Sequence, residues 1–332
     1  MNASLPRVSI GVPVYNGEKY LRAALDSLLA QTFTDFEIVI CDNASSDSTE
    51  QICQEYVQRD RRVKYHRNEY NIGPVKNYNR AFELSQGYYF KWATHDDVYA
   101  PTWLERCVEV MDTNPDVALC STHLQYIDEI GQFIQDYRYK VDSDHRHTPT
   151  RLLNLLCVDH RRHSANEVLG LMRRDMMLQI PPQGLYARSD SVFLVRVALF
   201  GRFYEVPEPL FFNREHPQRS SRVSSISSRG RTQMAQLLGI GPMPPTEWFD
   251  PTKKGKLTMP EWNLVKQYWI SIGFAPLQLG DRLGCYLAFF YWLFRHIPKL
   301  MRDLLIASEL IARALLQEGL IDLSPRKQRS AN

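Results

Sequence analysis

Apolar residues follow two different spacings along the first third of the chain. Short runs that are apolar almost throughout predict strands, since a strand buried on both faces has no polar side. These runs are residues 7–14, 36–41, 63–66, 88–93 and 117–121. The stretches between them with apolar residues at helical spacing are 17–31, the segment after Asp47 and Ser48, 74–85 and 101–113. This alternation predicts an α/β fold with a mostly parallel sheet and helices on both of its faces.

A cluster of glycine and proline residues at 238–245 divides the chain, because both residue types interrupt regular structure. We therefore expect a first domain over residues 1–235. A second region over 240–332 is expected to be helical, and it is rich in aromatic residues.

Composition narrows the range of functions. The 332 residues are 44% hydrophobic and 23% charged, as is typical of a globular protein. Forty Lys and Arg side chains oppose 37 Asp and Glu, and this balance of +3 argues against a nucleic-acid partner that is bound through bulk charge. Six cysteines without a CxxC pair predict reduced thiols in a cytoplasmic protein. We see no secretory leader and no apolar run of the roughly 20 residues that a spanning helix needs.

Polar residues with binding chemistry follow three of the predicted strands. Tyr15 follows the first strand, Asp42 ends the second, and the pair Asp96 and Asp97 follows the fourth. Each feature alone is typical of an ordinary turn or helix cap. Parallel strands bring their carboxyl ends to one edge, where such sheets bind ligands. Together, an aromatic ring and several carboxylates can bind a nucleotide and a divalent cation such as Mg²⁺ or Mn²⁺.

Three segments of the chain resemble the family-2 glycosyltransferases with the GT-A fold. They are VSIGVPVYNGEKYLRAALDSLLAQTFTDFEIVICDNASSDST, NEYNIGPVKNYNRAF and YYFKWATHDDVYAPTWLE. The resemblance covers residues 7–218 and implies a GT-A type sheet that binds a nucleotide-diphospho-sugar. It implies that residues 1–122 form the nucleotide-sugar half of the first domain and 123–235 the acceptor and catalytic half.

The resemblance also implies roles for single residues. The residues expected to contact the nucleotide-sugar are Pro13, Tyr15, Asn16, Glu18, Asp42, Asn43, Lys76, His95, Asp96 and Arg214. Among them, Asp42 is expected to meet the base and Asp96 the ribose or sugar. Asp97 and His216 are expected to hold the metal, Mn²⁺ or Mg²⁺. The chain departs from the family at His95, where an acidic or small residue is common.

Lys76 lies near the start of a predicted helix, and helix starts favour anionic oxygens. A plain loop with an exposed lysine is the alternative there. The basic loop at 160–163 is interpreted as exposed and near the acceptor or phosphates. Residues 167–172 are expected to form a strand that faces the acceptor.

A sugar transfer with inversion needs a base that takes the proton of the acceptor hydroxyl. The resemblance assigns this role to Asp190, in the segment YARSDSVFL, although Ser189 stands where the family usually has a second acid. As an alternative, Asp190 caps the helix that follows. The run 218–222, after the arginine-x-histidine segment that ends at His216, is expected to form a lid.

Residues 283–294 (LGCYLAFFYWLF) are strongly apolar and are flanked by Arg282 and Arg295. Three interpretations stay open. The segment packs on the first domain as a core helix, lies in a membrane interface, or forms the face of a homodimer. An amphipathic helix is expected to continue over 304–316, and the basic tail at 325–332 is expected to be disordered.

The sequence thus predicts a metal-dependent inverting glycosyltransferase, of the hexosyltransferase type. It would act on a hydroxyl of a glycan or lipid-linked glycan in cell-surface polysaccharide or glycoconjugate synthesis. We expect it in the cytoplasm, or on the inner face of the cell membrane as a peripheral protein. One alternative is a non-catalytic assembly protein that retains the fold. The other is a sugar-phosphate nucleotidyltransferase, which usually carries a glycine-rich phosphate loop that VPVYNGEKYL lacks.

Overall fold

The structure is a computed structural model that describes residues 5–317, apart from 161, 164, 218, 220–245 and 255. The glycine- and proline-rich boundary at 238–245 and the tail at 325–332 lie outside the described residues. The same holds for all of the expected lid except Arg219.

One nine-stranded sheet forms the centre of the protein, with the strand order β3-β2-β1-β4-β8-β6-β9-β5 and β7 paired to β6. The strands are β1 (Val8–Val14), β2 (Phe36–Asp42), β3 (Val63–Arg67), β4 (Tyr89–Trp92), β5 (Val98–Tyr99), β6 (Val117–Ile127), β7 (Phe133–Asp136), β8 (Leu171–Arg173) and β9 (Arg202–Arg214). The predicted α/β fold is confirmed. The parallel arrangement holds for β3-β2-β1-β4, whereas the other half is mixed, because β8 runs antiparallel to both β4 and β6.

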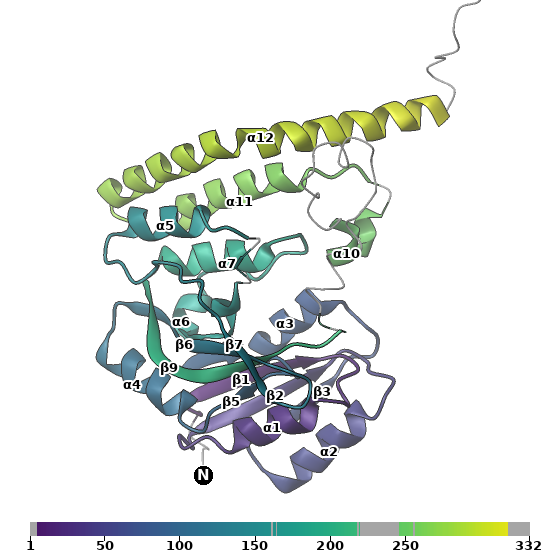
Figure 1. The fold of residues 1–332 in the computed structure, drawn as a ribbon, viewed down its shortest axis with the longest axis vertical. Helices are drawn as coiled ribbons and strands as arrows, with labels where there is room; N and C mark the ends of the chain where they lie inside the picture. The colour runs from purple at the N-terminus through teal and green to yellow at the C-terminus, as the bar shows by residue number, and fades with distance from the viewer. Residues whose placement is uncertain are drawn as a thin grey trace, which may run out of the picture.

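Helices cover both faces of this sheet, with α1 and α2 on one side and α3 and α7 on the other (Figure 1). The helices of the first half are α1 (Leu21–Leu29), α2 (Thr49–Arg59), α3 (Pro74–Glu83) and α4 (Trp103–Thr113). Those that follow are α5 (Thr148–Leu156), α6 (Arg174–Met177), α7 (Ser189–Ala198), α10 (Thr246–Phe249), α11 (Pro260–Phe274) and α12 (Leu279–Gln317). The first four helices lie within the predicted stretches, which extend a few residues beyond them.

The start of α3 has a local cause. Gly73 precedes the helix at φ 87°, a conformation that glycine adopts without strain, and Pro74 then occupies the first helical turn, where its missing N–H costs nothing. The prediction of a strand over residues 167–172 is largely wrong. Asn166–Leu169 is a 3₁₀ helix, and only β8 follows it.

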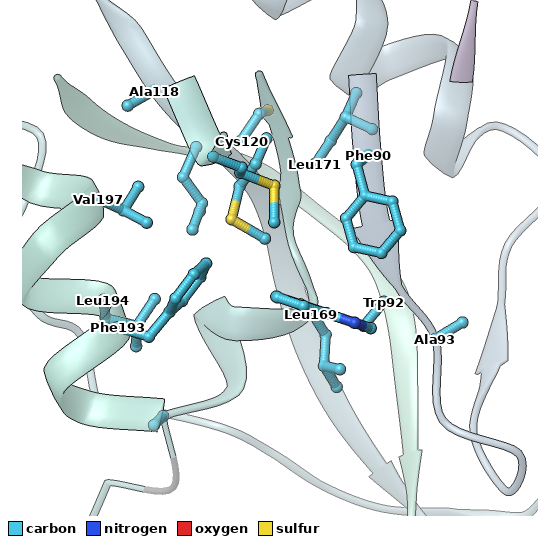
Figure 2. Close-up of a cluster of buried hydrophobic side chains, with 14 of the residues drawn as sticks. Phe90, Trp92, Ala93, Ala118, Cys120, Leu169, Leu171, Phe193, Leu194 and Val197 are labelled. Carbon is cyan, nitrogen blue, oxygen red and sulfur yellow. The ribbon is translucent and has the colours of Figure 1, made fainter. Parts of the chain in front are cut away.

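A buried cluster joins α7 to the centre of the sheet (Figure 2). Phe193 of α7 packs edge-on against Trp92 of β4, with ring centroids 5.4 Å apart, and Trp92 packs in the same way on Phe90 at 5.0 Å. Leu171 of β8 and Cys120 of β6 complete this part of the core. The packing fixes the N-terminus of α7 relative to the carboxyl end of β4.

The C-terminal helices form a layer at one end of the molecule, and α5 and α7 lie between this layer and the sheet (Figure 1). Residues 283–294 and 304–316 belong to one helix, α12, which has 39 residues and contains Pro298. The core-helix interpretation holds for one face of α12, which is buried at Cys285, Phe289 and Trp292. No helix in the described ranges is long and apolar enough to cross a membrane.

Lys91 is a lysine that is fully buried in β4, inside the sheet. Its Nζ lies 3.6 Å from the ring centroid of Tyr99 and 4.2 Å from that of Trp103, and it has no hydrogen-bond partner among the described residues. Burial lowers the pKa of Lys91 well below its ordinary value. The folded protein therefore binds a proton at this amine less tightly than the unfolded chain does.

This difference predicts a pH-dependent stability. Below the unfolded pKa of about 10.4, the unfolded chain gains a proton that the folded protein lacks, so stability is lost as the pH falls through this window. The limiting slope is about 1.4 kcal/mol per pH unit for one group. Lys91→Met is expected to remove this slope and to raise the free energy of unfolding at pH 7, measured by urea titration at pH 7–10. Lys140→Met, at an exposed lysine, is the control. Lys91→Met could instead be destabilised, with the free energy of unfolding still changing with pH at the same slope. That result would mean that the rings of Tyr99 and Trp103 hold a charged ammonium.

Candidate functional site

The loops that follow β1 and β2 are fastened to each other. The N–H of Asn16 donates to Ser45 Oγ at 2.9 Å, and Asn16 Oδ1 accepts from the N–H of Ser46 at 2.9 Å. Glu18 Oε2 accepts from the N–H of Ser48 at 3.0 Å. Asn16 has φ 52°, so the chain turns sharply at this point. Two of the residues expected to line the nucleotide pocket therefore shape the rim of the sheet.

Pro13 and Tyr15 flank the end of β1 on the same rim. Pro13 is buried opposite Cys41 in the parallel register of β1 and β2. The Tyr15 side chain is 47% exposed, which leaves its ring accessible for stacking on a base.

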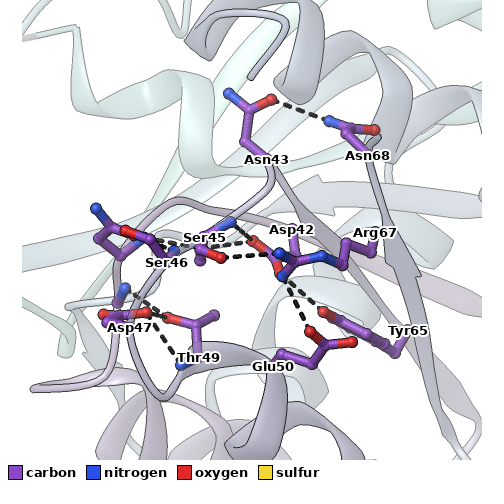
Figure 3. Close-up of polar contacts among 12 residues, drawn as sticks. Asp42, Asn43, Ser45, Ser46, Asp47, Thr49, Glu50, Tyr65, Arg67 and Asn68 are labelled. Carbon is purple, nitrogen blue, oxygen red and sulfur yellow. Dashed lines mark hydrogen bonds and ion pairs between the residues drawn. The ribbon is translucent and has the colours of Figure 1, made fainter. Parts of the chain in front are cut away.

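Asp42, at the carboxyl end of β2, is completely buried, and both of its carboxylate oxygens have partners (Figure 3). Oδ1 accepts from the N–H and the hydroxyl of Ser45 at 2.9 and 2.5 Å. Oδ2 accepts from the Tyr65 hydroxyl at 2.7 Å and from Arg67 Nη1 at 2.8 Å. A base N–H at this carboxylate would have to displace one of these partners. The expected contact between Asp42 and the base stays a prediction.

Asn43 belongs to a network of amides that fixes the loop before α3. Its Oδ1 accepts from Asn68 Nδ2 at 3.0 Å and from the N–H of Ile72 at 2.9 Å, and its Nδ2 donates to Asn71 at 2.8 Å. Asn77 of α3 joins the network through Asn68 at 3.0 Å. The network holds the segment NEYNIGP against the end of β2.

Lys76 lies exposed on α3. The hydrogen bond from Thr252 and, to a smaller extent, the charge of Lys76 lower the pKa of Asp250. The ammonium therefore lies within electrostatic reach of the segment that joins α10 to α11.

The two carboxylates after β4 have different surroundings. Asp97 is 1% exposed, and its Oδ1 accepts from the N–H of Arg214 at 2.8 Å. Its Oδ2 accepts from Asn213 Nδ2 at 2.9 Å and from the Thr94 hydroxyl. Burial and the neighbouring charge of Asp96 raise the pKa of Asp97. Asp97 thus ties the loop after β4 to the end of β9.

Asp96 faces His216, with 2.9 Å between Asp96 Oδ2 and His216 Nε2. Burial opposes the ionisation of Asp96, but the hydrogen bond with His216 and the charges of His95 and His216 outweigh it, and the pKa of Asp96 lies below its ordinary value. Within the part of the chain that the structure describes, His216 Nδ1 is buried without a hydrogen-bond partner. His95 lies against Gly17, since a Cβ at Gly17 would come within 2.9 Å of its ring.

Arg214 is 5% exposed and donates to main-chain carbonyls. Its Nε donates to the carbonyl of Asp96 at 2.8 Å, and its Nη1 donates to those of Asp128 and Glu129 at 3.0 Å each. These bonds hold the backbone of Asp96 in place. A contact of Arg214 with the diphosphate stays a prediction.

Asp190 lies in the first turn of α7, and the residue at the cap position is Arg188, which has φ 63°. The N-cap alternative for Asp190 is therefore wrong. Asp190 Oδ1 accepts from the N–H of Ser191 at 2.7 Å. Burial raises the pKa of Asp190 above its ordinary value, against the Ser191 amide and the charge of Arg188. A raised pKa suits a general base that works near neutral pH.

Tyr78 of α3 links the two halves of the site. Burial raises the pKa of Tyr78, and the negative charges of Asp96, Asp97 and Asp190 raise it further. These three carboxylates therefore lie within electrostatic reach of one tyrosine, although they lie on segments far apart in the chain. Asp42 lies at the same edge of the sheet, separated from β4 by β1.

The metal can be judged from the chemistry of these side chains. In the part of the chain that the structure describes, no group of three or more His, Cys, Asp or Glu residues could hold a metal ion. Asp96 and His216 offer one carboxylate oxygen and one imidazole nitrogen in contact with each other, a pair that suits Mn²⁺. A cation that binds a diphosphate obtains its remaining oxygen ligands from phosphate and water.

Sequence reasoning missed the residues that position these groups. Tyr65 and Arg67 hold Asp42, whereas Thr94 and Asn213 hold Asp97. Arg67, Thr94 and Asn213 each lie next to a recognised motif, and that adjacency is the signal that could have found them. The basic loop at 160–163 was expected to be exposed, but His163 is buried and its Nδ1 lies 2.7 Å from the hydroxyl of Tyr137.

Sequence similarity links the chain to one protein family and to several known proteins. The family described as glycosyl transferase family 2 matches residues 9–179 of the chain. An uncharacterized glycosyltransferase of Methanocaldococcus jannaschii is 33% identical over 135 residues, which are 40% of this chain and 47% of that protein. Chondroitin synthase of Escherichia coli is 33% identical over 204 residues, which are 58% of this chain and 29% of that protein. The matches span less than half the length of these relatives.

Among solved structures, S. aureus TarS in complex with UDP has a TM-score of 0.51 and 18% sequence identity, covering 81% of both chains. GalNAc-T7 with UDP, GalNAc and Mn²⁺ has a TM-score of 0.51 and 14% identity, covering 65% of this chain and 45% of that one. At these identities the likeness shows a shared GT-A fold.

Proposed function

Since the chain belongs to glycosyl transferase family 2, we propose that it transfers a sugar from a nucleotide-diphospho-sugar to a hydroxyl group of a glycan, with inversion at the anomeric carbon. The observation that carries this proposal is that two acidic groups lie within electrostatic reach of Tyr78. One is Asp190, whose pKa is raised, and the other is Asp96, which contacts His216. The first can serve the acceptor and the second the donor.

The proposed reaction is a single displacement. Asp190 takes the proton from the acceptor hydroxyl as that oxygen forms a bond to the anomeric carbon. The bond between the anomeric carbon and the diphosphate breaks, and the nucleoside diphosphate leaves with the electron pair. Tyr15 would stack on the base, and Asn16 and Glu18 keep the rim beside it in shape. Asn43 and its amide network hold the segment that opens α3 and carries Lys76.

We assign the metal to Asp96 and His216. The sequence-based assignment gave the metal to Asp97 and His216, but all the contacts of the Asp97 carboxylate serve the fold, and it is almost completely buried. A bound Mn²⁺ or Mg²⁺ would neutralise negative charge on the diphosphate. Arg214 positions Asp96 by binding its carbonyl oxygen.

The test is donor turnover by the full chain. UDP-, GDP- and dTDP-sugars are incubated with and without Mn²⁺, and the release of nucleoside diphosphate is measured by chromatography. UDP-sugars come first, because a neighbour of the same fold, S. aureus TarS, has been crystallised with UDP and with UDP-GlcNAc.

The outcomes separate the alternatives. Release that increases with a glycan acceptor supports the transferase. Binding of donors without turnover would favour a non-catalytic assembly protein. Formation of a nucleotide-sugar from a nucleoside triphosphate and a sugar phosphate would instead favour a nucleotidyltransferase. The nature of the acceptor, a free glycan or a lipid-linked one, is part of the same proposal and is tested by offering both.

A further inference from the structure

The outer face of α12 is apolar over a long distance. Seven large apolar side chains, each 42–75% exposed, follow one another at spacings of three and four residues and form what we call the outer stripe. The outer stripe consists of Leu283, Leu287, Phe290, Phe294, Ile297, Met301 and Leu305. At 1.5 Å per residue it is about 33 Å long. The opposite face of the helix carries Cys285 and Trp292, which pack inward.

Helix α11 widens this surface. Trp262, Trp269, Ile270 and Phe274 are 36–47% exposed on α11. A hollow of about 380 Å³ lies between the two helices, and its lining side chains are all apolar or aromatic, among them Trp262, Phe290 and Phe294. An exposed apolar surface of this kind marks a site of interaction with a membrane or a partner protein.

The exposed charges of this region have one sign. Within the described residues of 251–312, the exposed charged side chains are Lys253, Lys254, Lys256, Lys266 and Arg295. The acids of this region are at least partly buried, and the two most buried, Glu261 and Asp303, are used inside the layer. Glu261 binds His296 at 2.8 Å and Arg302 at 2.9 Å, and Asp303 accepts from the N–H of Glu261 at 3.1 Å.

We propose that the outer face of α11 and α12 binds an anionic lipid bilayer, with both helices lying in the membrane interface. Aromatic and aliphatic side chains would enter the boundary of the acyl chains, while Lys266 and Arg295 would face the anionic headgroups. A second copy of the chain is the less favourable occupant. Self-association of this face would bring exposed cations against exposed cations, while the acids in the described part of 251–312 are partly or fully buried.

Binding through this face would also orient the candidate site. Arg196 of α7 donates to Gln267 of α11 at 2.9 Å and to Ser271 at 3.3 Å. Helix α7, which carries Asp190 in its first turn, is therefore fastened to the layer that would lie on the bilayer. A lipid-linked acceptor would meet Asp190 from a fixed direction. This consequence rests on the proposed function, whereas the docking itself does not.

Vesicle flotation of the full chain tests the docking without any activity assay. Vesicles of phosphatidylglycerol and phosphatidylcholine are expected to float the protein, and vesicles of phosphatidylcholine alone are expected to float much less of it. Phe294→Glu is expected to lower the partition by at least about tenfold, since burial of a phenylalanine is worth more than the 1.4 kcal/mol of a tenfold change. Arg295→Glu is expected to weaken binding only to the anionic vesicles.

The matched control is Leu178→Glu, at a leucine that is 60% exposed at the end of α6. This variant should float like the wild type. No flotation of the wild type, or equal flotation of Phe294→Glu, would overturn the proposal. It would also be overturned by a lipid-independent dimer in sedimentation velocity that Phe294→Glu dissociates. If the wild type floats with the vesicles but transfers no sugar, the result would count against the proposed function alone.

Discussion

The Asp190→Asn variant is expected to bind the nucleotide-sugar as the wild type does and to transfer the sugar about 100- to 10,000-fold more slowly. The amide has nearly the same size, and its oxygen can still accept from the N–H of Ser191, the bond that Asp190 makes at 2.7 Å. The start of α7 should therefore persist. The amide cannot take the acceptor proton, so kcat should fall while the dissociation constant of the donor stays constant.

The pH profile provides an independent readout. A general base must be ionised, so transfer by the wild type is expected to fall as the pH falls through the pKa of Asp190, which burial raises. Asp190→Asn should lose this limb together with the rate. The control is Asp175→Asn, because Asp175 accepts from the N–H of the next residue at 2.8 Å in the same way but lies at the start of α6. Wild-type turnover in Asp190→Asn would refute the assignment.

The strands and helices of the first half could be predicted because their causes are local. A strand buried on both faces has to be apolar throughout, as Phe36–Asp42 is apart from Glu37 and its terminal aspartate. The second half lacks such signals. β8 has three residues and follows a 3₁₀ helix. Its place depends on the approach of Gly170 to the Cys120 carbonyl, since a Cβ would come within 2.8 Å of that oxygen. No pattern in residues 165–173 contains that information.

The candidate site also has features that the sequence predicts and features that only the tertiary structure shows. Strand-end motifs located Tyr15, Asp42 and the Asp96-Asp97 pair at one sheet edge, because parallel strands end together. They could not distinguish which carboxylate is free to act, since the partners come from elsewhere in the chain. Asp97 is bound by Asn213 and Arg214, which follow it by 116 and 117 positions and lie at the end of β9. The division of roles between neighbouring acids is therefore a property of the tertiary structure.

The outer stripe of α12 belongs to a segment that the sequence located but could not interpret. The sequence identified residues 283–294 as apolar, but three interpretations fitted that composition. Burial separates them by face: Phe289 is 2% exposed, whereas the adjacent Phe290 is 52% exposed. One side of the helix belongs to the core, and the other side is left for a partner.

Replacement of Asp96 and replacement of Asp97 should affect different properties, the first donor binding and the second stability. Asp96→Asn is expected to weaken donor binding in the presence of Mn²⁺ by at least about tenfold and to leave the melting temperature close to that of the wild type. An asparagine can keep the contact with His216, but it lacks the negative charge that a hard cation prefers. The measurement is calorimetric titration of donor with and without Mn²⁺, alongside thermal unfolding.

Asp97→Asn should instead lower the free energy of unfolding by about 1–3 kcal/mol, the cost of leaving a buried polar group without a partner. Asp97 accepts from three donors, and an amide has only one accepting oxygen, so its NH₂ would face a donor such as Asn213. The remaining folded protein should still respond to Mn²⁺. Asp35→Asn, at an exposed position, controls for the change of charge. If Asp97→Asn abolished the Mn²⁺ response in a stable protein while Asp96→Asn kept it, the metal would belong to Asp97. The contacts described above would then have to rearrange when the donor binds.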